Sequence, residues 1–234
     1  MKILALDSSA VVGSVALCED TRMVAHYTLN TGNTHSQTLL PMIESALKSA
    51  DWEIDDLDLL AVSQGPGSFT GVRIGISTVK GLAFGKNIPC AGVSTLEALA
   101  YNLRYFNGIL CPVMNARRAQ VYNALFACRD GVMTRLCPDR AISMAELDEE
   151  LAGMEQPIYL VGDGYDITLR GLTKTAVLPV PDELRYQSGY SVALCALAAY
   201  ERGQAVDDAT LAPVYLRPSQ AERERNERLA KENG

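Results

Sequence analysis

Long apolar runs are missing from this sequence, and basic residues are in deficit. No stretch approaches the roughly 18 consecutive hydrophobic residues of a transmembrane helix, so no membrane span is expected. The opening segment reaches Asp7 after a few apolar residues, which is too short for a signal peptide. Lys and Arg number 21 against 28 Asp and Glu. The resulting net charge of −7 disfavours unaided binding to nucleic acid.

Metal-binding and catalytic patterns are also missing. The six cysteines are scattered and form no C-x-x-C pair, which argues against structural zinc and against a disulfide framework. A reducing cytoplasm is therefore the expected compartment. The two histidines, His26 and His35, do not form an H-E-x-x-H pattern, and Ser68 has no plausible His–Asp partners for a hydrolase triad. No catalytic and no metal-ligating residue is predicted.

The 234 residues do carry the pattern of an α/β protein, with 48% hydrophobic and 21% charged residues. In the first part, apolar or alternating runs predict strands, and apolar residues at 3.6-residue spacing predict helices. The predicted strands are 3–6, 11–17, 23–29, 57–62 and 88–93. The predicted helices begin at Thr34 or Ser36, near Val72, and at Ser94 or Thr95.

The second part begins with a similar series of three strands. These are 109–114, 121–127 and 132–136, followed by a helix capped at Ser143, a strand over 157–161 and an apolar helix over 191–200. Two related α/β subdomains with mixed sheets are therefore predicted. Their expected ranges are 1–105 and 106–217, with the final helix as a candidate to pack back on the first subdomain. A charged tail, 218–234, is expected to be a solvated helix or frayed end, with partner binding as the alternative.

Two loops have residues suited to phosphate binding. Gly65 and Gly67 lie between a predicted strand and helix, where backbone N–H groups can approach an anion, although the loop is neither a Walker A nor a G-x-G-x-x-G motif. A tight connection between the two elements is the alternative. Asp7 and Ser8 form a polar turn that suits Mg²⁺-phosphate or, equally, a turn held by its own side chains.

Three further polar residues have two interpretations each. His35 stands at a helix start, where an exposed or capping role competes with a catalytic one. Arg73 and Lys80 lie on one predicted helix and suit an acidic partner or a phosphate, or else extend along the surface to water.

Several stretches together resemble the bacterial TsaB (YeaZ) family, over nearly the whole chain to about Arg217. The most specific is GPGSFTGVRIG from Gly65 to Gly75. The others are ILALDSS from Ile3, SVAL from Ser14, HS at His35 with LLPMI from Leu39, KGLA from Lys80, NARR from Asn115 with VY at Val121, GDG from Gly162 and PVYLR from Pro213.

The resemblance implies an actin/hexokinase/Hsp70-like fold of two subdomains. It also implies a cytoplasmic role in making threonylcarbamoyladenosine beside the tRNA anticodon. In that pathway a TsaB-like protein pairs with the paralogous transferase TsaD, and the ATPase TsaE joins them. Contact with tRNA is then expected only through the complex.

The resemblance also suggests that this chain is not itself the transferase. TsaD-like proteins carry two metal-binding histidines four residues apart, and Thr95 and Leu99 stand at the matching positions. Leu cannot bind a metal and Thr is a poor ligand for a borderline one. The chain also departs from the family where Asn115 replaces the usual Asp, which weakens a metal or nucleotide role for the second subdomain.

The leading hypothesis is a non-catalytic partner subunit. It offers two apolar helices, from about His35 to Leu47 and from about Val72 to Phe84, to the same helices of TsaD, with a homodimer through the same surface when TsaD is absent. The alternative for these helices is packing only in the subunit's own core. A second hypothesis is an ATPase or phosphotransferase with contacts at Asp7, Ser8, Gly65 and Gly67, or ATP or ADP bound only at the joint with TsaD. A glycopeptidase is disfavoured. The expected interface residues are His35, Ser36, Leu39, Leu40, Ile43, Leu47, Val72, Arg73, Ile74, Ser77 and Lys80.

Overall fold

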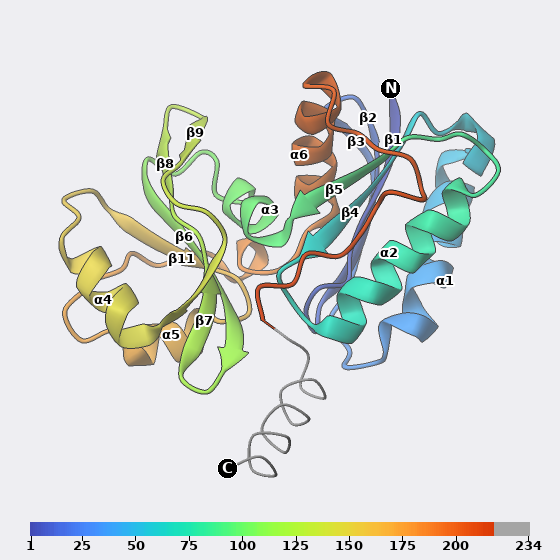
Figure 1. Cartoon of the computed structure of the whole chain (residues 1–234). Helices are drawn as coiled ribbons and strands as arrows, with labels where there is room; N and C mark the ends of the chain where they lie inside the picture. The colour runs from blue at the N-terminus through green and yellow to red at the C-terminus, as the bar shows by residue number, and fades with distance from the viewer. Residues whose placement is uncertain (218–234) are drawn as a thin grey trace, which may run out of the picture.

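The computed structural model describes residues 1–217, and the predicted tail over 218–234 lies outside this range. The first sheet has the strand order β3-β2-β1-β4-β5 (Figure 1). The first three strands are antiparallel neighbours, whereas β4 and β5 continue the sheet in parallel with β1. The strands are β1 (Lys2–Asp7), β2 (Gly13–Glu19), β3 (Arg22–Leu29), β4 (Leu59–Gly65) and β5 (Cys90–Ser94).

Helices cover both faces of this sheet (Figure 1). Because side chains alternate along a strand, Leu4 and Leu6 face one core, while Ile3 and Ala5 face the other. The first core is closed by α1 (His35–Ala50) and α2 (Phe69–Ala83), and the second by α6 (Gly189–Glu201). A short 3-10 helix (Ile54–Asp56) precedes β4, and α3 (Thr95–Tyr101) follows β5.

The second sheet repeats the plan of the first. Its central strand β6 (Gly108–Arg117) pairs antiparallel with both β7 (Gln120–Asn123) and β8 (Phe126–Arg129), which are two halves of one path. The next stretch of chain is also divided into two strands: β9 pairs with β8, and β10 pairs with β7. Strand β11 pairs with β6 in parallel. The remaining elements are β9 (Val132–Arg135), β10 (Arg140–Ser143), α4 (Met144–Ala152), β11 (Ile158–Val161), α5 (Tyr165–Gly171) and a 3-10 helix (Asp182–Leu184).

The α/β class with mixed sheets is thereby confirmed. In each sheet three strand paths run antiparallel in chain order, and a strand parallel to the first follows after a helix. This duplicated arrangement is the actin/hexokinase/Hsp70-like fold that the family resemblance implies. Among residues 1–217, no helix is both long and apolar enough to cross a membrane.

The end of the described chain returns to the first subdomain. Helix α6 packs against β1, β2 and β5 rather than against the second sheet, and it is apolar around its whole circumference because it is buried there. Residues 204–217, which we call the C-terminal strap, then run along the first sheet and α2 (Figure 1). The predicted range 106–217 therefore includes a segment, from α6 onward, that packs on the first subdomain.

Several element boundaries differ from the predictions. The predicted strand 121–127 is broken at Ala124 and Leu125, which are both fully buried. Helix α2 begins at Phe69, not near Val72, because the Ser68 hydroxyl caps it by accepting a hydrogen bond from the Gly71 N–H. The elements β10 and α5 were not predicted, since their sequences are short and weakly patterned.

Candidate partner-binding groove and interdomain cleft

The glycine-rich loop after β4 packs directly against the turn that follows β1. The Ser68 N–H donates to the Ser9 carbonyl at 2.7 Å, and the Ser8 hydroxyl donates to the Gly71 carbonyl at 2.9 Å. A Cβ on Gly67 would lie 2.5 Å from the Ser9 carbonyl oxygen, and one on Gly71 would lie 2.1 Å from that of Ser8. These two glycines are therefore required for the close approach of two backbone segments.

The carboxylate of Asp7 is fully buried beneath this loop. It accepts hydrogen bonds from the N–H and the hydroxyl of Ser9, at 2.8 and 2.6 Å, and from the Ser63 hydroxyl. Complete desolvation raises the pKa of Asp7 above its ordinary value, although the hydrogen bonds from Ser63 and Ser9 act in the opposite direction. The turn is thus held by its own side chains, which is one of the two interpretations of its sequence.

The structure brings the four predicted nucleotide contacts together, but it also gives each of them a local role. Ser8 is fully buried with its hydroxyl bonded to Gly71. Gly65 has φ +120°, and a Cβ there would lie 2.3 Å from the Val214 carbonyl oxygen of the C-terminal strap. Nucleotide contact by Asp7, Ser8, Gly65 and Gly67 stays a prediction.

A polar cleft of about 590 Å³ lies between the two subdomains, beside these loops. Asp163, from the Gly-Asp-Gly turn after β11, lines it, and desolvation in the cleft raises the pKa of Asp163 to about 6, with the charge of Asp7 adding to the effect. Predicted family positions Asn115 and Arg217 also line the cleft. The other lining residues are Ser9, Ala10, Val11, Pro66, Gly67, Ser68, Phe69, Thr70, Met114, Ala116, Arg117, Tyr122, Val214, Tyr215 and Leu216.

A second hollow, of about 750 Å³, lies between α1 and α2, which run side by side on the outer face of the first subdomain (Figure 1). Its surface is mainly apolar, with Leu40 49% exposed on the α1 side and Ile74 half-buried on the α2 side. We call it the α1/α2 groove. It is lined by His35, Ser36, Leu39, Leu40, Phe69, Thr70, Arg73, Ile74, Ser77, Thr78, Gly81 and Leu82.

The predicted interface residues differ in how the structure places them. Five of them have exposed or half-buried side chains that line the α1/α2 groove, together with Arg73: His35, Ser36, Leu40, Ile74 and Ser77. A correction is needed for three others, which are at most 8% exposed, pack in the subunit's own core because the apolar stripe of each helix faces the sheet, and do not line the groove: Ile43, Leu47 and Val72. Leu39 is 1% exposed and packs in the same core, but it also lines the groove.

Two other predicted side chains are already engaged within the chain. Lys80 donates from Nζ to the carbonyls of Ala209 and Leu211, each at 3.1 Å, so it holds the C-terminal strap and does not line the groove. The His35 ring donates from Nε2 to the Ala10 carbonyl at 2.6 Å and so ties the start of α1 to the loop after β1. His35 therefore has a structural contact here.

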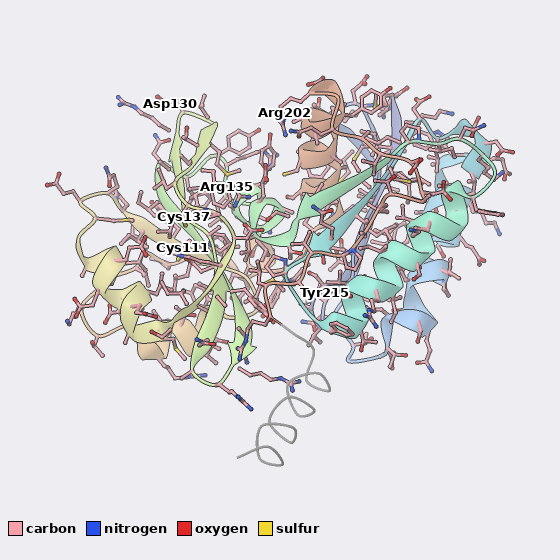
Figure 2. All side chains as sticks on the ribbon, in the orientation of Figure 1. Cys111, Asp130, Arg135, Cys137, Arg202 and Tyr215 are labelled. Atoms are coloured by element: carbon pink, nitrogen blue, oxygen red, sulfur yellow. The ribbon has the colours of Figure 1, made fainter. Side chains whose placement is uncertain are left out.

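An aromatic cluster closes one end of the groove, where the groove adjoins the cleft. Phe69 and Tyr215 stack with ring centroids 4.6 Å apart, and the Arg73 guanidinium lies 3.8 Å from the Phe69 centroid. The Arg73 Nε donates to the Tyr215 hydroxyl at 2.7 Å. Figure 2 shows Tyr215 beside the N-terminal end of α2. Phe69 and Tyr215 were not predicted as site residues, although both lie within the stretches that resemble the TsaB family.

The two positions that the family resemblance sets against the TsaD-like histidines, Thr95 and Leu99, contribute to the interior. Thr95 is fully buried, and Leu99 belongs to an apolar cluster that also contains Ala10 and Met114 from the cleft. Among residues 1–217, no group of three or more His, Cys, Asp or Glu side chains is placed to hold a metal. At the departure from the family pattern, the Asn115 side chain accepts a hydrogen bond from the Arg117 N–H at 2.8 Å and so shapes the β6–β7 turn.

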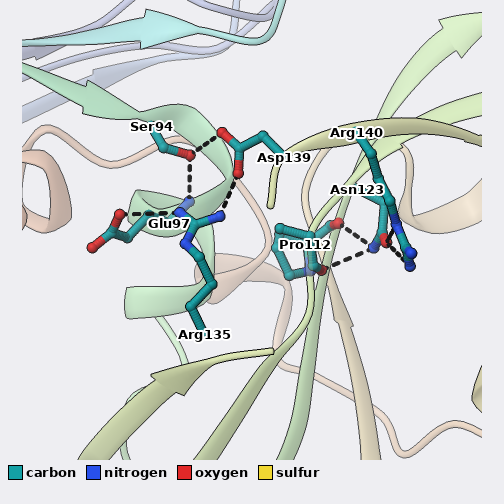
Figure 3. A network of polar contacts seen from close by, with 8 residues as sticks. Ser94, Glu97, Pro112, Asn123, Arg135, Asp139 and Arg140 are labelled. Atoms are coloured by element: carbon teal, nitrogen blue, oxygen red, sulfur yellow. Dashed lines mark hydrogen bonds and ion pairs between the residues drawn. The ribbon is translucent and has the colours of Figure 1, made fainter. Parts of the chain in front are cut away.

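A polar network joins the two subdomains near α3 (Figure 3). Arg135, at the end of β9, donates to Asp139 at 2.6 Å and to Glu97 of α3 at 3.1 Å. The Ser94 hydroxyl, which also caps α3, donates to Asp139 at 2.5 Å. The network fixes the second sheet against the first at this point.

The chain is similar in sequence to a known class of proteins. The model of the family described as tRNA N6-adenosine threonylcarbamoyltransferase matches residues 26–222. Within that class, the chain is 33% identical to the tRNA threonylcarbamoyladenosine biosynthesis protein TsaB of Bacillus subtilis, covering 95% of this chain and 96% of the relative. It is 32% identical to TsaB of Escherichia coli, over 93% and 95% of the two chains. The protein belongs to the TsaB (YeaZ) family of tRNA threonylcarbamoyladenosine biosynthesis.

Solved structures agree with this assignment. YeaZ from Pseudomonas aeruginosa matches with a TM-score of 0.78 and 27% identity, over 92% of this chain and 99% of that one. The match extends over both subdomains.

Proposed function

We propose that this chain is a non-catalytic partner subunit of the transferase TsaD, acting in the cytoplasm, and that it binds TsaD through the α1/α2 groove. The observation that carries the proposal is the groove itself, a mainly apolar hollow between two adjacent helices. Leu40 leaves an exposed apolar side chain on its rim. A paralogous subunit presents similar helices, and two such pairs pack as a four-helix interface.

The chemistry of the transferase is assigned to TsaD. Leu99 and Thr95 in this chain fill its interior, and the Asp7 turn is closed by its own hydrogen bonds. Binding of TsaE, and contact with tRNA, belong to the assembled complex, since a chain of net charge −7 is poorly suited to hold a polyanion alone.

Leu40→Asp tests this function. The side chain is 49% exposed, so the free energy of unfolding is expected to change by less than about 1 kcal/mol. A charge in an apolar interface costs about 2 kcal/mol or more of binding free energy, so the variant should no longer co-purify with TsaD from the same genome. Ile74→Asp is also expected to abolish co-purification, but it should lower the free energy of unfolding more than Leu40→Asp does, because Ile74 is half-buried and packs against the core of the first subdomain.

Val132→Asp is the matched control, because Val132 is 69% exposed on β9 in the second subdomain. It should co-purify like the wild type, and circular dichroism should show all variants folded. Unchanged co-purification of a folded Leu40→Asp variant would remove the groove from the interface.

Nucleotide binding is a second candidate, favoured by the polar cleft of about 590 Å³ beside the helix α2 N-terminus. ATP or ADP would then bind at the joint with TsaD, since the cleft and the groove share Phe69 and Thr70. Calorimetry with ATP and ADP, together with phosphate release from ATP, measured on the subunit alone and on the complex with TsaD, separates this from an ATPase activity of the subunit itself. A heat of nucleotide binding that is measured with the complex, but not with the subunit alone, supports binding at the joint with TsaD.

A further inference from the structure

We infer that Arg73 selects the occupant of the α1/α2 groove, and that this occupant is an apolar helix of a different protein with a carboxylate placed against the Arg73 guanidinium. The inference rests on the proposed function and names the chemistry that the partner must supply. It starts from the charges of the two helices that form the groove.

Arg73 is the one Lys, Arg, Asp or Glu residue among the described residues that line the groove. Helices α1 and α2 together contain a single carboxylate, Glu44, which does not line the groove. The face is therefore cationic within a chain whose net charge is −7. The chemical complement of an apolar surface with one cation is an apolar surface with one anion.

The guanidinium is held in place before any partner arrives. Phe69 lies 3.8 Å beneath it, Tyr215 accepts from its Nε at 2.7 Å, and the two rings stack on each other. The hydrogen bond uses Nε, and none is found from the two terminal Nη groups within the described residues. A planar fork fixed in this way loses little side-chain entropy when it pairs with a carboxylate.

Tyr215 owes its position to the C-terminal strap. The Val214 N–H donates to the Gln64 carbonyl at 2.7 Å, and Leu211, 3% exposed, anchors the strap in the core of the first subdomain. Tyr215 is therefore a positioning residue for Arg73, although it lies 142 positions away in the sequence.

The same charges argue against a second copy of this chain as the preferred occupant. Two copies related by a two-fold axis would bring two Arg73 side chains into one interface, with no groove-lining carboxylate to neutralise them. A partner with an acidic residue on its docking helix avoids this cost.

The test measures the dissociation constant for TsaD of the same genome by calorimetry, with Arg73→Gln and the matched control Arg129→Gln, whose side chain is 91% exposed on β8. We expect Arg73→Gln to weaken binding by about tenfold or more, and to flatten its dependence on salt, while the control binds like the wild type. Arg73→Lys should restore only part of the affinity. Tyr215→Phe keeps the ring and loses the hydrogen bond, so a loss of a few-fold is expected.

A charge swap identifies the carboxylate. Each acidic residue on the docking helices of TsaD is changed to Lys in turn, and one of these variants should recover binding to Arg73→Glu. Equal binding by Arg73→Gln and Arg129→Gln would overturn the role of Arg73 while leaving the proposed function standing. Failure of the wild-type chain to bind TsaD would overturn both. A wild-type homodimer that light scattering detects and Arg73→Gln abolishes would make a second copy the occupant and contradict the inference.

Discussion

At the scale of single residues, Asp148 shows how one carboxylate can organise a loop. Its side chain is 4% exposed and accepts hydrogen bonds from the N–H groups of Thr173, Lys174 and Thr175, at 2.7, 3.0 and 3.1 Å, and from the Thr173 hydroxyl. Desolvation alone would raise the pKa of Asp148, but these hydrogen bonds outweigh it and lower the pKa to about 2.

The lowered pKa makes a prediction about acid stability. The pKa of Asp148 falls from 3.8 to about 2 on folding, so the stabilisation is present above pH 4 and is lost as the pH falls from about 4 to about 2. Asp148→Asn should therefore lower the free energy of unfolding at pH 7, and the gap to the wild type should narrow below pH 4. Urea unfolding at pH 7, 4 and 3 measures both; a gap that stays constant with pH would contradict this account.

The sequence indicated some site residues at this scale and not others. Leu40 and Ile74 were expected at the interface from the family resemblance, on helices that apolar spacing predicted, and both line the groove. Spacing could not separate Ile74 from Val72, because α2 has apolar side chains both on the face that packs on the sheet and along the groove. Tyr215 could not be predicted from local pattern, since its contact with Arg73 depends on where the strap returns.

At the scale of elements, helix α2 contains glycines in two different environments, one tightly packed and one open. Gly71 lies in the first turn, where a Cβ would meet the Ser8 carbonyl at 2.1 Å. Gly81 lies near the other end, where a Cβ would have no neighbour within 4 Å. The same residue type therefore has a packing role at one end of the helix and none at the other.

Replacing each glycine by alanine should change stability in opposite directions. Gly71→Ala forces apart two backbone segments and should cost about 1–3 kcal/mol of unfolding free energy. Gly81→Ala should add about 0.5–1 kcal/mol, because alanine favours a helix over glycine. Thermal or urea unfolding of the two variants checks this pair, and a Gly71→Ala variant as stable as the wild type would show that the loop and the turn are not tightly packed.

Elements with strong patterns were predictable, and short ones were not. The β1–β2 hairpin, both long helices of the first subdomain and the capping box at Ser143 follow from alternation, spacing and cap residues. The break between β7 and β8 does not, because Ala124 and Leu125 are as apolar as their neighbours and the strand path divides only in the context of the sheet.

At the scale of the whole molecule, the features that connect the subdomains include α6 packing back on the first sheet, the strap, the network around Arg135, and the apolar cluster that joins Leu99 of α3 to Met114 of β6. The strap ends at Arg217, which donates to the Ala116 carbonyl at 2.8 Å across the cleft. The repeated strand order was predictable from the pattern of elements. The packing of α6 on the first subdomain was predicted only as a possibility, because no local sequence pattern shows which of the two sheets an apolar helix covers.

The central claim is that this chain contributes to threonylcarbamoyladenosine formation by binding TsaD and not by chemistry of its own. Its most direct test is reconstitution from purified components, with the modified nucleoside measured by mass spectrometry after digestion of the tRNA. With threonylcarbamoyl-AMP supplied as the donor and TsaE and ATP present in every reaction, we predict product with TsaD and this chain together, none with this chain in place of TsaD, and a loss of product with a folded Leu40→Asp variant. Product from this chain without TsaD, or full activity with Leu40→Asp, would contradict the claim.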